Sequence, residues 1–357
     1  MSARLRVVLD QLAQVSEPDQ ASAAVDLARA LVKTTPAGCS VEAIVPAGAE
    51  VSIAGLTGVR TLGLARRELA ASWQLGIAAG VGGGMIHAPS LMAPLVRHDR
   101  VHDHDQTTVT LWCLDAWDAP ETMSKSSVAW HKAMLKRAVK HADAVVVPSH
   151  AIAARLGELS ALGDRIRVIP GAPPAGFAVP HDAVSRRATL GLPPRYLALT
   201  GTAATVHAGF RAAAAVGIDA VVLDAPDGSE PRLAEVAAAS GLPEARAHIR
   251  GSLPPEDRAA VFAGAAAYAA THTVAAWPWR AVEAMAVGTP VVAVASGTHH
   301  DVIADGGLLV DEVDVTAAIE EAVGASAARL SVLAADRSRA FAWEGAAERV
   351  WSLHADL

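Results

Sequence analysis

The residue best placed to do binding chemistry is an acidic one, Glu283, near the start of a predicted helix. The helix lies in the middle of Trp277 to Val292, which reads WPWRAVEAMAVGTPVV. Gly288 and Pro290 end it, and an apolar run of strand type follows. A carboxylate in a first helical turn is favoured by the helix dipole and lies beside N–H groups that have no partner within the helix. The stretch therefore predicts a polar binding surface wherever that turn faces a cleft.

Histidines supply most of the other groups that could do chemistry. His299 follows Thr298 just after a predicted strand, and His87 lies where an earlier strand would end. The run from His102 to Asp105 alternates histidine with aspartate, so it would place two metal ligands on one face of a strand. A solvated loop is the preferred interpretation of that run, and we predict no metal site.

Composition limits the class of protein that these residues serve. The chain has 357 residues, of which 52% are hydrophobic and 19% are charged. This indicates a globular protein with room for two domains. The net charge of -7 argues against a nucleic-acid binder, which would normally be basic. Two cysteines are too few for a disulfide framework or a cysteine-based zinc site.

Nothing in the sequence predicts secretion or insertion into a membrane. The first residues, MSARLRVVLDQLAQ, lack the apolar core of a signal peptide. The longest weakly charged stretch, Leu75 to Val96, is interrupted by glycines and prolines, so it is a poor transmembrane candidate. We therefore expect a cytoplasmic protein. A basic helix, Trp130 to Ala142, leaves open the alternative of contact with the inner face of the membrane.

Short apolar strands alternate with helical patterns along the whole chain. In the first half, strands are predicted at residues 5–9, 41–45, 107–114, 143–148 and 165–170, and in the second half at 196–200, 220–223, 266–270, 291–294 and 307–310. Such alternation is the pattern of a parallel, doubly wound α/β sheet. A proline-rich segment with little periodicity separates the halves, so the sequence predicts two α/β domains and a linker. Ligands of such sheets bind at the carboxyl ends of the strands.

Several runs of residues together resemble a known family, the retaining glycosyltransferases of GT-B type (family 4-like, glycosyl transferases group 1). The runs are Ala142 to Ala151 with Arg165 to Gly171, Tyr196 to Thr202, and Glu283 to Val292 with Ala304 to Asp311. Phe341 to Glu344 is similar to the start of the family's C-terminal helix. His87 to Ser90 and Pro120 to Thr122 resemble the actinobacterial version of the family.

The resemblance implies two Rossmann-like domains whose parallel sheets face each other across a cleft. It assigns residues 1–175 to an acceptor-side domain, 176–194 to a linker, 195–335 to a nucleotide-sugar domain and 336–357 to a C-terminal helix that packs back on the first domain. It also implies transfer of a mannose- or glucose-type hexose to a cell-envelope or polysaccharide acceptor with retention, without a metal or other cofactor.

The residues at the family's functional positions depart from its pattern. Glu283 matches the second of two glutamates, which accepts from the ribose, but the first falls at Ala275. The Arg-Lys pair that stabilises the diphosphate falls at Thr202 and His207, and the histidine that contacts the sugar falls at Trp112. The motifs are therefore degenerate. A glycine-rich turn is also replaced, by Val15 to Gln20, whose two carboxylates would repel a diphosphate.

Two sets of candidate site residues follow from the resemblance. The nucleotide-sugar set is Glu283, Gly201, Thr202, His207, Gly251, Thr298 and His299. The set on the acceptor side of the cleft is His87, Trp112 and Trp277. The catalytic residues are left unassigned.

Three functions stay open at this point. The first is an active glycosyltransferase with a nucleotide-sugar donor and a glycan or glycolipid acceptor. The second is a catalytically silent GT-B protein that acts as partner or scaffold of an active glycosyltransferase, in a homo- or hetero-dimer. The third is a carbohydrate-binding protein, which would be favoured if Trp112, Trp277 and Trp279 faced one groove.

Overall fold

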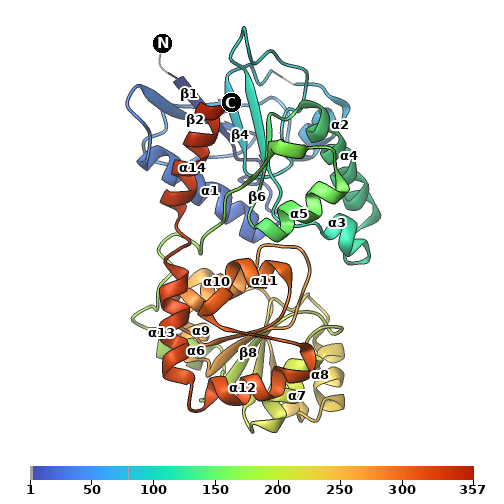
Figure 1. Ribbon diagram of the computed structural model, residues 1–357, viewed down its shortest axis with the longest axis vertical. Helices are drawn as coiled ribbons and strands as arrows, with labels where there is room; N and C mark the ends of the chain where they lie inside the picture. The colour runs from blue at the N-terminus through green and yellow to red at the C-terminus, as the bar shows by residue number, and fades with distance from the viewer. Residues whose placement is uncertain (1–2, 79) are drawn as a thin grey trace. The chain divides into compact units, whose positions relative to one another are not determined.

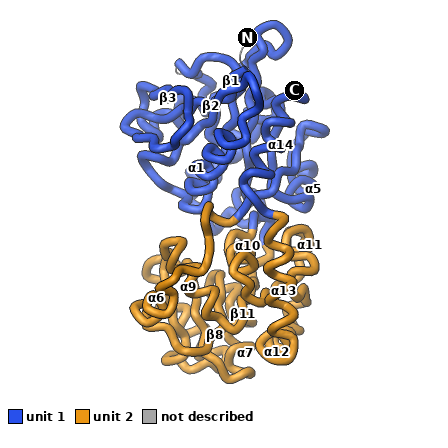
Figure 2. The backbone as a smooth tube through the Cα atoms, turned by 90° about the vertical axis from the view of Figure 1, so that its left-hand side faces the viewer, with its two compact units in different colours: residues 1–172, 274–277, 341–357 blue, residues 173–273, 278–340 orange. Residues whose placement is uncertain are grey.

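The chain folds into two compact units (Figure 2). The computed structural model describes residues 3–78 and 80–357. Unit 1 comprises residues 1–172, 274–277 and 341–357, and unit 2 comprises residues 173–273 and 278–340. Each unit is an α/β body with its own parallel sheet and its own buried core.

The described residues of unit 1 form a seven-stranded parallel sheet in the order β3-β2-β1-β4-β5-β6-β7. The strands are β1 (Ala3–Val8), β2 (Cys39–Val45), β3 (Gly58–Thr61), β4 (Met85–Ala88), β5 (Gln106–Thr110), β6 (Ala144–Val147) and β7 (Ile166–Val168). The helices are α1 (Pro18–Lys33), α2 (Arg66–Leu75), α3 (Asp115–Asp118), α4 (Lys125–His141), α5 (His150–Leu159) and α14 (Trp343–Asp356). The strand order reverses between β1 and β4, which is where ligands of such sheets bind.

The described residues of unit 2 form a six-stranded parallel sheet in the order β10-β9-β8-β11-β12-β13. The strands are β8 (Tyr196–Thr200), β9 (Asp219–Leu223), β10 (Ala247–Ile249), β11 (Ala267–Ala270), β12 (Val291–Val294) and β13 (Leu308–Val310). The helices are α6 (Ala183–Thr189), α7 (His207–Ala215), α8 (Glu230–Ala239), α9 (Pro255–Gly264), α10 (Trp279–Ala286), α11 (Gly297–Val302), α12 (Val315–Val323) and α13 (Ala327–Ser338). Here the order reverses between β8 and β11.

Helices cover both faces of each sheet, so the central strands are apolar on both sides. In unit 1, side chains of α2, α4 and α5 pack on one face, as Trp73, Met134 and Leu156 show. In unit 2, side chains of α7, α8 and α12 form the corresponding layer. All four residues of β6 and of β11 are buried. The alternation of short apolar runs with helical patterns therefore correctly predicted the fold class.

The C-terminal helix α14 packs against α1 within unit 1 (Figure 1). The indole Nε1–H of Trp351 donates to the carbonyl oxygen of Leu31 at 3.2 Å, and Lys33 pairs with Glu344 at 2.8 Å. Four residues from the second half of the sequence also belong to unit 1. They attach as an antiparallel bridge between Cys113 and Ala276.

The segment predicted as an interdomain linker, 176–194, is part of unit 2 and contains a helix. This helix, α6, packs against α9, and Arg186 pairs with Asp257 of α9 at 2.7 Å. The prediction rested on prolines and weak periodicity. A helix of 7 residues is too short to give a clear helical period in the sequence. None of the helices in the described ranges has the length and apolarity needed to span a lipid bilayer.

Candidate functional site

The carboxyl ends of the central strands of unit 2 bring most of the predicted nucleotide-sugar residues into one region. Gly201 and Thr202 follow β8, and Thr298 and His299 begin α11 after β12. Gly251 follows β10, which lies two strands away from β8, so it is at the margin of this region. The region is the reversal point of the sheet, as the fold class requires for a ligand site.

Glu283 is buried in an ion-pair network, with 1% of its surface exposed. Arg258 Nε donates to Glu283 Oε2 at 2.9 Å, and Arg258 Nη2 donates to Oε1 at 2.6 Å. Arg280 Nη1 also donates to Oε1, at 3.0 Å, and Arg280 Nε donates to Asp224 Oδ2 at 2.6 Å. Two guanidinium groups and two carboxylates thus neutralise one another.

The structure corrects the expected position of Glu283 in its helix. Helix α10 begins at Trp279 after the N-cap residue Pro278, and no acidic residue lies in its first turn. Glu283 therefore lies in the second turn. Its carboxylate is stabilised by bidentate contact with Arg258 and by Arg280 rather than by the helix dipole.

The backbone of the loop after β8 packs against side chains of the same loop, mainly Thr205. Gly201 has a φ of +144°, and a Cβ atom there would lie 2.5 Å from Thr205 Oγ1. Thr202 N–H donates to that same hydroxyl oxygen at 3.0 Å. His207, the first residue of α7, pairs with Glu312 at 2.7 Å. The loop therefore offers mainly the Thr202 hydroxyl, because most of its N–H groups bond within the loop and its one histidine is paired to a carboxylate.

His299 is held as a neutral imidazole at the end of β12. Its Nδ1 bonds the carbonyl oxygen of Val294 at 2.7 Å, which requires the proton on Nδ1 and leaves Nε2 as an acceptor. Burial lowers the pKa of His299. Ser296 caps α11 by accepting from the His299 N–H at 3.2 Å.

Unit 1 has a pocket of about 260 Å³ where β1, β4 and β5 end. It is lined by Asp10, Gln11, Ser16, Glu17, Gln20, Arg66, Ala70, Ser90, Leu91, Met92, Thr110, Leu111, Trp112, Cys113, Ser127, Trp130 and His131. Asp10 pairs with Arg66 at 3.0 Å and accepts from Ser90 Oγ at 3.1 Å. Gln11 Oε1 accepts from the N–H groups of Ser16 and Glu17, at 3.0 and 2.8 Å, and so shapes the loop before α1.

Burial and nearby carboxylates shift the pKa values of the groups around this pocket. Burial raises the pKa of Asp10, and Arg66 and Ser90 only partly offset it. Partial burial, with the charges of Asp115 and Asp19, raises the pKa of Glu17. Burial lowers the pKa of His131, so this imidazole stays neutral near pH 7.

His87 lies in the core of unit 1 and not at its ligand edge. It is fully buried in β4, where Nδ1 bonds Thr108 Oγ1 at 2.8 Å and the ring stacks edge-on against His354 of α14 at 5.7 Å. Burial, and to a smaller extent the charge of His354, lowers the pKa of His87 to about 3. The prediction of an acceptor-side role is wrong because His87 points into the layer beneath α14.

Trp112 and Trp277 pack together and are nearly buried, with 5% and 2% of their surfaces exposed. Both lie so close to Gly171 that a Cβ atom there would come within 2.9 Å of Trp112 Cζ3 and 3.0 Å of Trp277 Nε1. Phe341 stacks edge-on against Trp277 at 5.4 Å. Trp112 also lines the unit 1 pocket, while its Nε1–H donates to the carbonyl oxygen of Pro89 at 2.8 Å.

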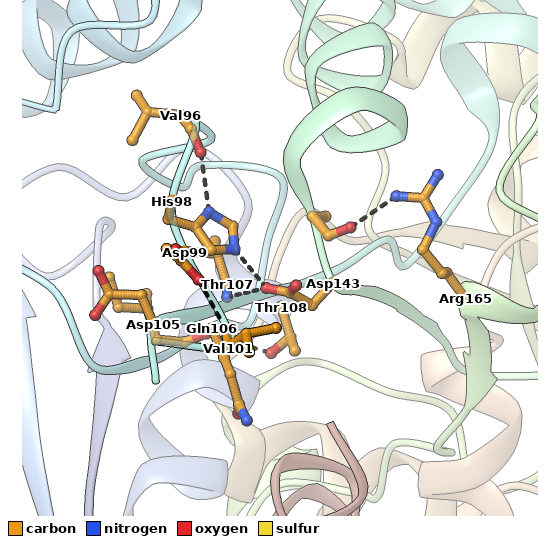
Figure 3. A network of polar contacts seen from close by, with 12 residues as sticks. Val96, His98, Asp99, Val101, Asp105, Gln106, Thr107, Thr108, Asp143 and Arg165 are labelled. Carbon is orange, nitrogen blue, oxygen red and sulfur yellow. Dashed lines mark hydrogen bonds and ion pairs between the residues drawn. The ribbon is translucent and has the colours of Figure 1, made fainter. Parts of the chain in front are cut away.

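A second polar network lies at the opposite, amino ends of the strands of unit 1 (Figure 3). His98 Nε2 bonds Asp143 Oδ2 at 2.8 Å, and this hydrogen bond raises the pKa of His98. His102 pairs with Asp99 on the surface at 2.8 Å. In the described ranges, no three His, Cys, Asp or Glu side chains gather as metal ligands, including those from His102 to Asp105.

One segment of unit 2 is similar to a known family. Residues 212–323 match the family model described as Glycosyl transferases group 1. The matched segment lies in unit 2 and contains Gly251, Glu283, Thr298 and His299, whereas the loop from Gly201 to His207 precedes it. No curated protein sequence matches the chain.

Solved structures resemble the whole chain and identify its fold as GT-B. Sucrose-phosphate synthase from Thermosynechococcus elongatus is 21% identical, with a TM-score of 0.69, and the match covers 99% of this chain and 98% of that one. Anabaena HepE in complex with UDP and glucose is 16% identical, with a TM-score of 0.67 and coverage of 99% and 100%. Trehalose 6-phosphate synthase from Burkholderia multivorans is 15% identical, with a TM-score of 0.61 and coverage of 100% and 99%.

The sequence did not reveal the partners of Glu283. Arg280 precedes it by three residues, a spacing that places two side chains together on a helix, so this pair could have been found. Arg258 and Asp224 come from other elements and carry no local signal.

Proposed function

We propose that the protein is a glycosyltransferase that takes a hexose from a nucleotide sugar, with the donor bound by unit 2. The match of residues 212–323 to Glycosyl transferases group 1 carries this proposal, because it covers α10, β12 and α11, which hold or position Glu283, Thr298 and His299 of the candidate donor site. A solved structure of the same fold contains UDP and glucose, which supports the choice of donor class. Retention, a mannose- or glucose-type hexose and a cell-envelope or polysaccharide acceptor are parts of the same proposal.

The donor site would hold its ligand mainly through uncharged groups. The loop after β8 would supply the Thr202 hydroxyl, because most of its main-chain N–H groups already bond within the loop. His299, on α11 after β12, would supply Nε2 as an acceptor. No metal or other cofactor is part of the proposal. Action in the cytoplasm, peripheral membrane contact and dimerisation are predictions of the same kind.

Calorimetric titration of the purified protein with UDP-glucose and with GDP-mannose tests the proposal, followed by an assay for transfer or hydrolysis of the bound sugar. We expect saturable binding and turnover. His299→Ala should weaken donor binding several-fold, because it removes a buried polar group at the predicted site. His300→Ala is the matched control, since His300 is exposed on the same short helix. Absence of binding to every donor would contradict the proposal.

A second candidate is a catalytically silent GT-B protein, and the contacts of Glu283 favour it. The carboxylate that would accept from a ribose already takes three hydrogen bonds from two arginines. The other family glutamate is replaced by Ala275, whose carbonyl oxygen accepts from Leu114 in unit 1 at 2.9 Å. Donor binding without turnover would identify this function. The near-complete burial of Trp112 and Trp277 argues against an open sugar-binding groove at these side chains.

A further inference from the structure

The pocket of unit 1 carries more negative than positive charge. Asp10 is compensated by Arg66 at 3.0 Å. Glu17 makes no ion pair with any residue in the described ranges, and neither does Asp115, whose charge reaches Glu17 and raises its pKa. His131 contributes no positive charge near pH 7, because burial lowers its pKa. Neither carboxylate thus has an ion-pair partner among the described residues, and the charge of Arg66 offsets that of Glu17 only in part.

The shape and walls of the pocket suit one small molecule. Its volume of about 260 Å³ is slightly below the range of roughly 300–1,000 Å³ in which drug-sized ligands bind. Leu91, Met92 and the two indoles of Trp112 and Trp130 give apolar walls, while Asp10, Glu17 and Ser90 give polar groups. A ligand with both apolar ring faces and hydroxyl groups matches this lining.

We propose that this pocket binds the acceptor, and that the acceptor is a small polyol without an anionic group, either neutral or amine-bearing. The inference rests on the proposed glycosyl transfer. It adds that the charges lining the unit 1 pocket select an acceptor without an anionic group. Glu17 is the anchoring residue, because its carboxylate accepts hydrogen bonds from hydroxyl or ammonium groups. A phosphorylated acceptor is excluded, because a phosphate brings about -1.5 to -2 charges at pH 7 next to two carboxylates.

The lining distinguishes this assignment from a site for the donor diphosphate. The loop from Ser16 to Glu17 that closes one side is fixed by Gln11 and presents a carboxylate. Arg66 is the one arginine or lysine among the residues that line this pocket, and it is engaged by the buried Asp10. No cation in the lining is therefore left to neutralise a diphosphate.

Ligand-detected NMR titration of the full-length protein in the absence of nucleotide tests the proposal. The probes are glucose, glucosamine and glucose 6-phosphate, with mannose and mannose 6-phosphate as a second pair. We expect each phosphorylated sugar to bind at least tenfold more weakly than its parent, and the difference to shrink in high salt, which screens the repulsion. Tighter binding of glucosamine than glucose would identify an amine-bearing acceptor, and equal binding a neutral one.

Glu17→Gln should reduce the discrimination against phosphate several-fold. Glu121→Gln, the same change at an exposed position outside the pocket, should leave it unchanged. Equal or tighter binding of the phosphorylated sugars by the unaltered protein would overturn the proposal, and so would failure of all five probes to bind. Since no donor is present, a failed donor titration leaves this result intact, and the two proposals can fail separately.

Discussion

Removing the carboxylate of Glu283 separates a structural role from a ligand-binding role. In Glu283→Ala, Arg258 and Arg280 lose an anionic partner in a region where their side chains are 7% and 10% exposed. Removing one partner of a buried ion pair costs about 3–5 kcal/mol, because the remaining charge is left without compensation. Arg280 keeps Asp224 at 2.6 Å, so the larger part of the loss falls on Arg258.

Urea unfolding followed by circular dichroism measures this loss. With a slope of about 2–3 kcal/mol per M, the midpoint for unit 2 should fall by about 1–2 M. Glu312→Ala is the control, because it removes a carboxylate from an ion pair in the same unit whose side chains are 39% and 52% exposed. That change should cost at most about 1 kcal/mol.

A double replacement checks that the loss comes from an unpaired charge. Arg258→Leu combined with Glu283→Leu removes both charges, so it should be less destabilising than the sum of the single changes by about 2 kcal/mol or more. The reasoning would be refuted if Glu283→Ala cost under 1 kcal/mol while nucleotide-sugar binding fell tenfold or more. That outcome would instead indicate that the Glu283 carboxylate binds the ribose of the nucleotide sugar.

Two other perturbations test the core of unit 1. Burial holds the pKa of His87 at about 3 and that of His354 at about 4, below the value of about 6.5 in the unfolded chain, so the unfolded state binds more protons in acid. The free energy of unfolding should therefore fall as pH drops from about 6.5 towards 4, by about 1.4 kcal/mol per pH unit for each histidine, and His354→Gln should reduce this slope in unfolding titrations. Gly171→Ala should cost about 1–3 kcal/mol in thermal or urea unfolding, because its Cβ would press on Trp112 and Trp277. Gly157→Ala, on helix α5 with no atom within 4 Å of the added carbon, should be neutral or stabilising.

The elements of the fold could be predicted from local patterns, because their signals lie in consecutive residues. Strand β6, with the run AVVV, is apolar along its whole length, and β8 is buried except at its last residue, Thr200; both end at clear turn residues. Strand β3 was missed because its sequence, GVRT, is at the sheet edge and largely exposed, so it has no apolar pattern. Helix α6 was missed for the same reason, since only Ala183 in it is buried.

The strand ends could be predicted from the sequence, but the contacts of the candidate site could not. Gly201, Thr298 and His299 do lie after strands of unit 2, and their role in binding a donor stays a prediction. His87 was misplaced because the sequence does not show which face of β4 it occupies, and that face is covered by α14, more than 250 residues further along the chain. The sequence pointed to the unit 1 pocket through Trp112 and the acidic run from Val15 to Gln20, whereas Arg66 and His131 come from separate helices and carry no local signal.

The two positions of the family's glutamate pair are bound to different parts of this structure. Ala275 is tied by its main chain to Leu114 in unit 1, whereas Glu283 is tied by its side chain to arginines in unit 2. Two glutamates can bind one nucleotide sugar together only if both carboxylates are able to contact it. Here one side chain is a methyl group and the other is already neutralised. If unit 2 binds a nucleotide sugar as proposed, its affinity would come from uncharged groups such as the Thr202 hydroxyl and His299. Such groups stabilise a departing diphosphate less than charged groups do. Under the proposed function, we therefore expect a nucleotide sugar to bind through uncharged hydrogen-bonding groups even where the cleavage of its sugar–phosphate bond is slow.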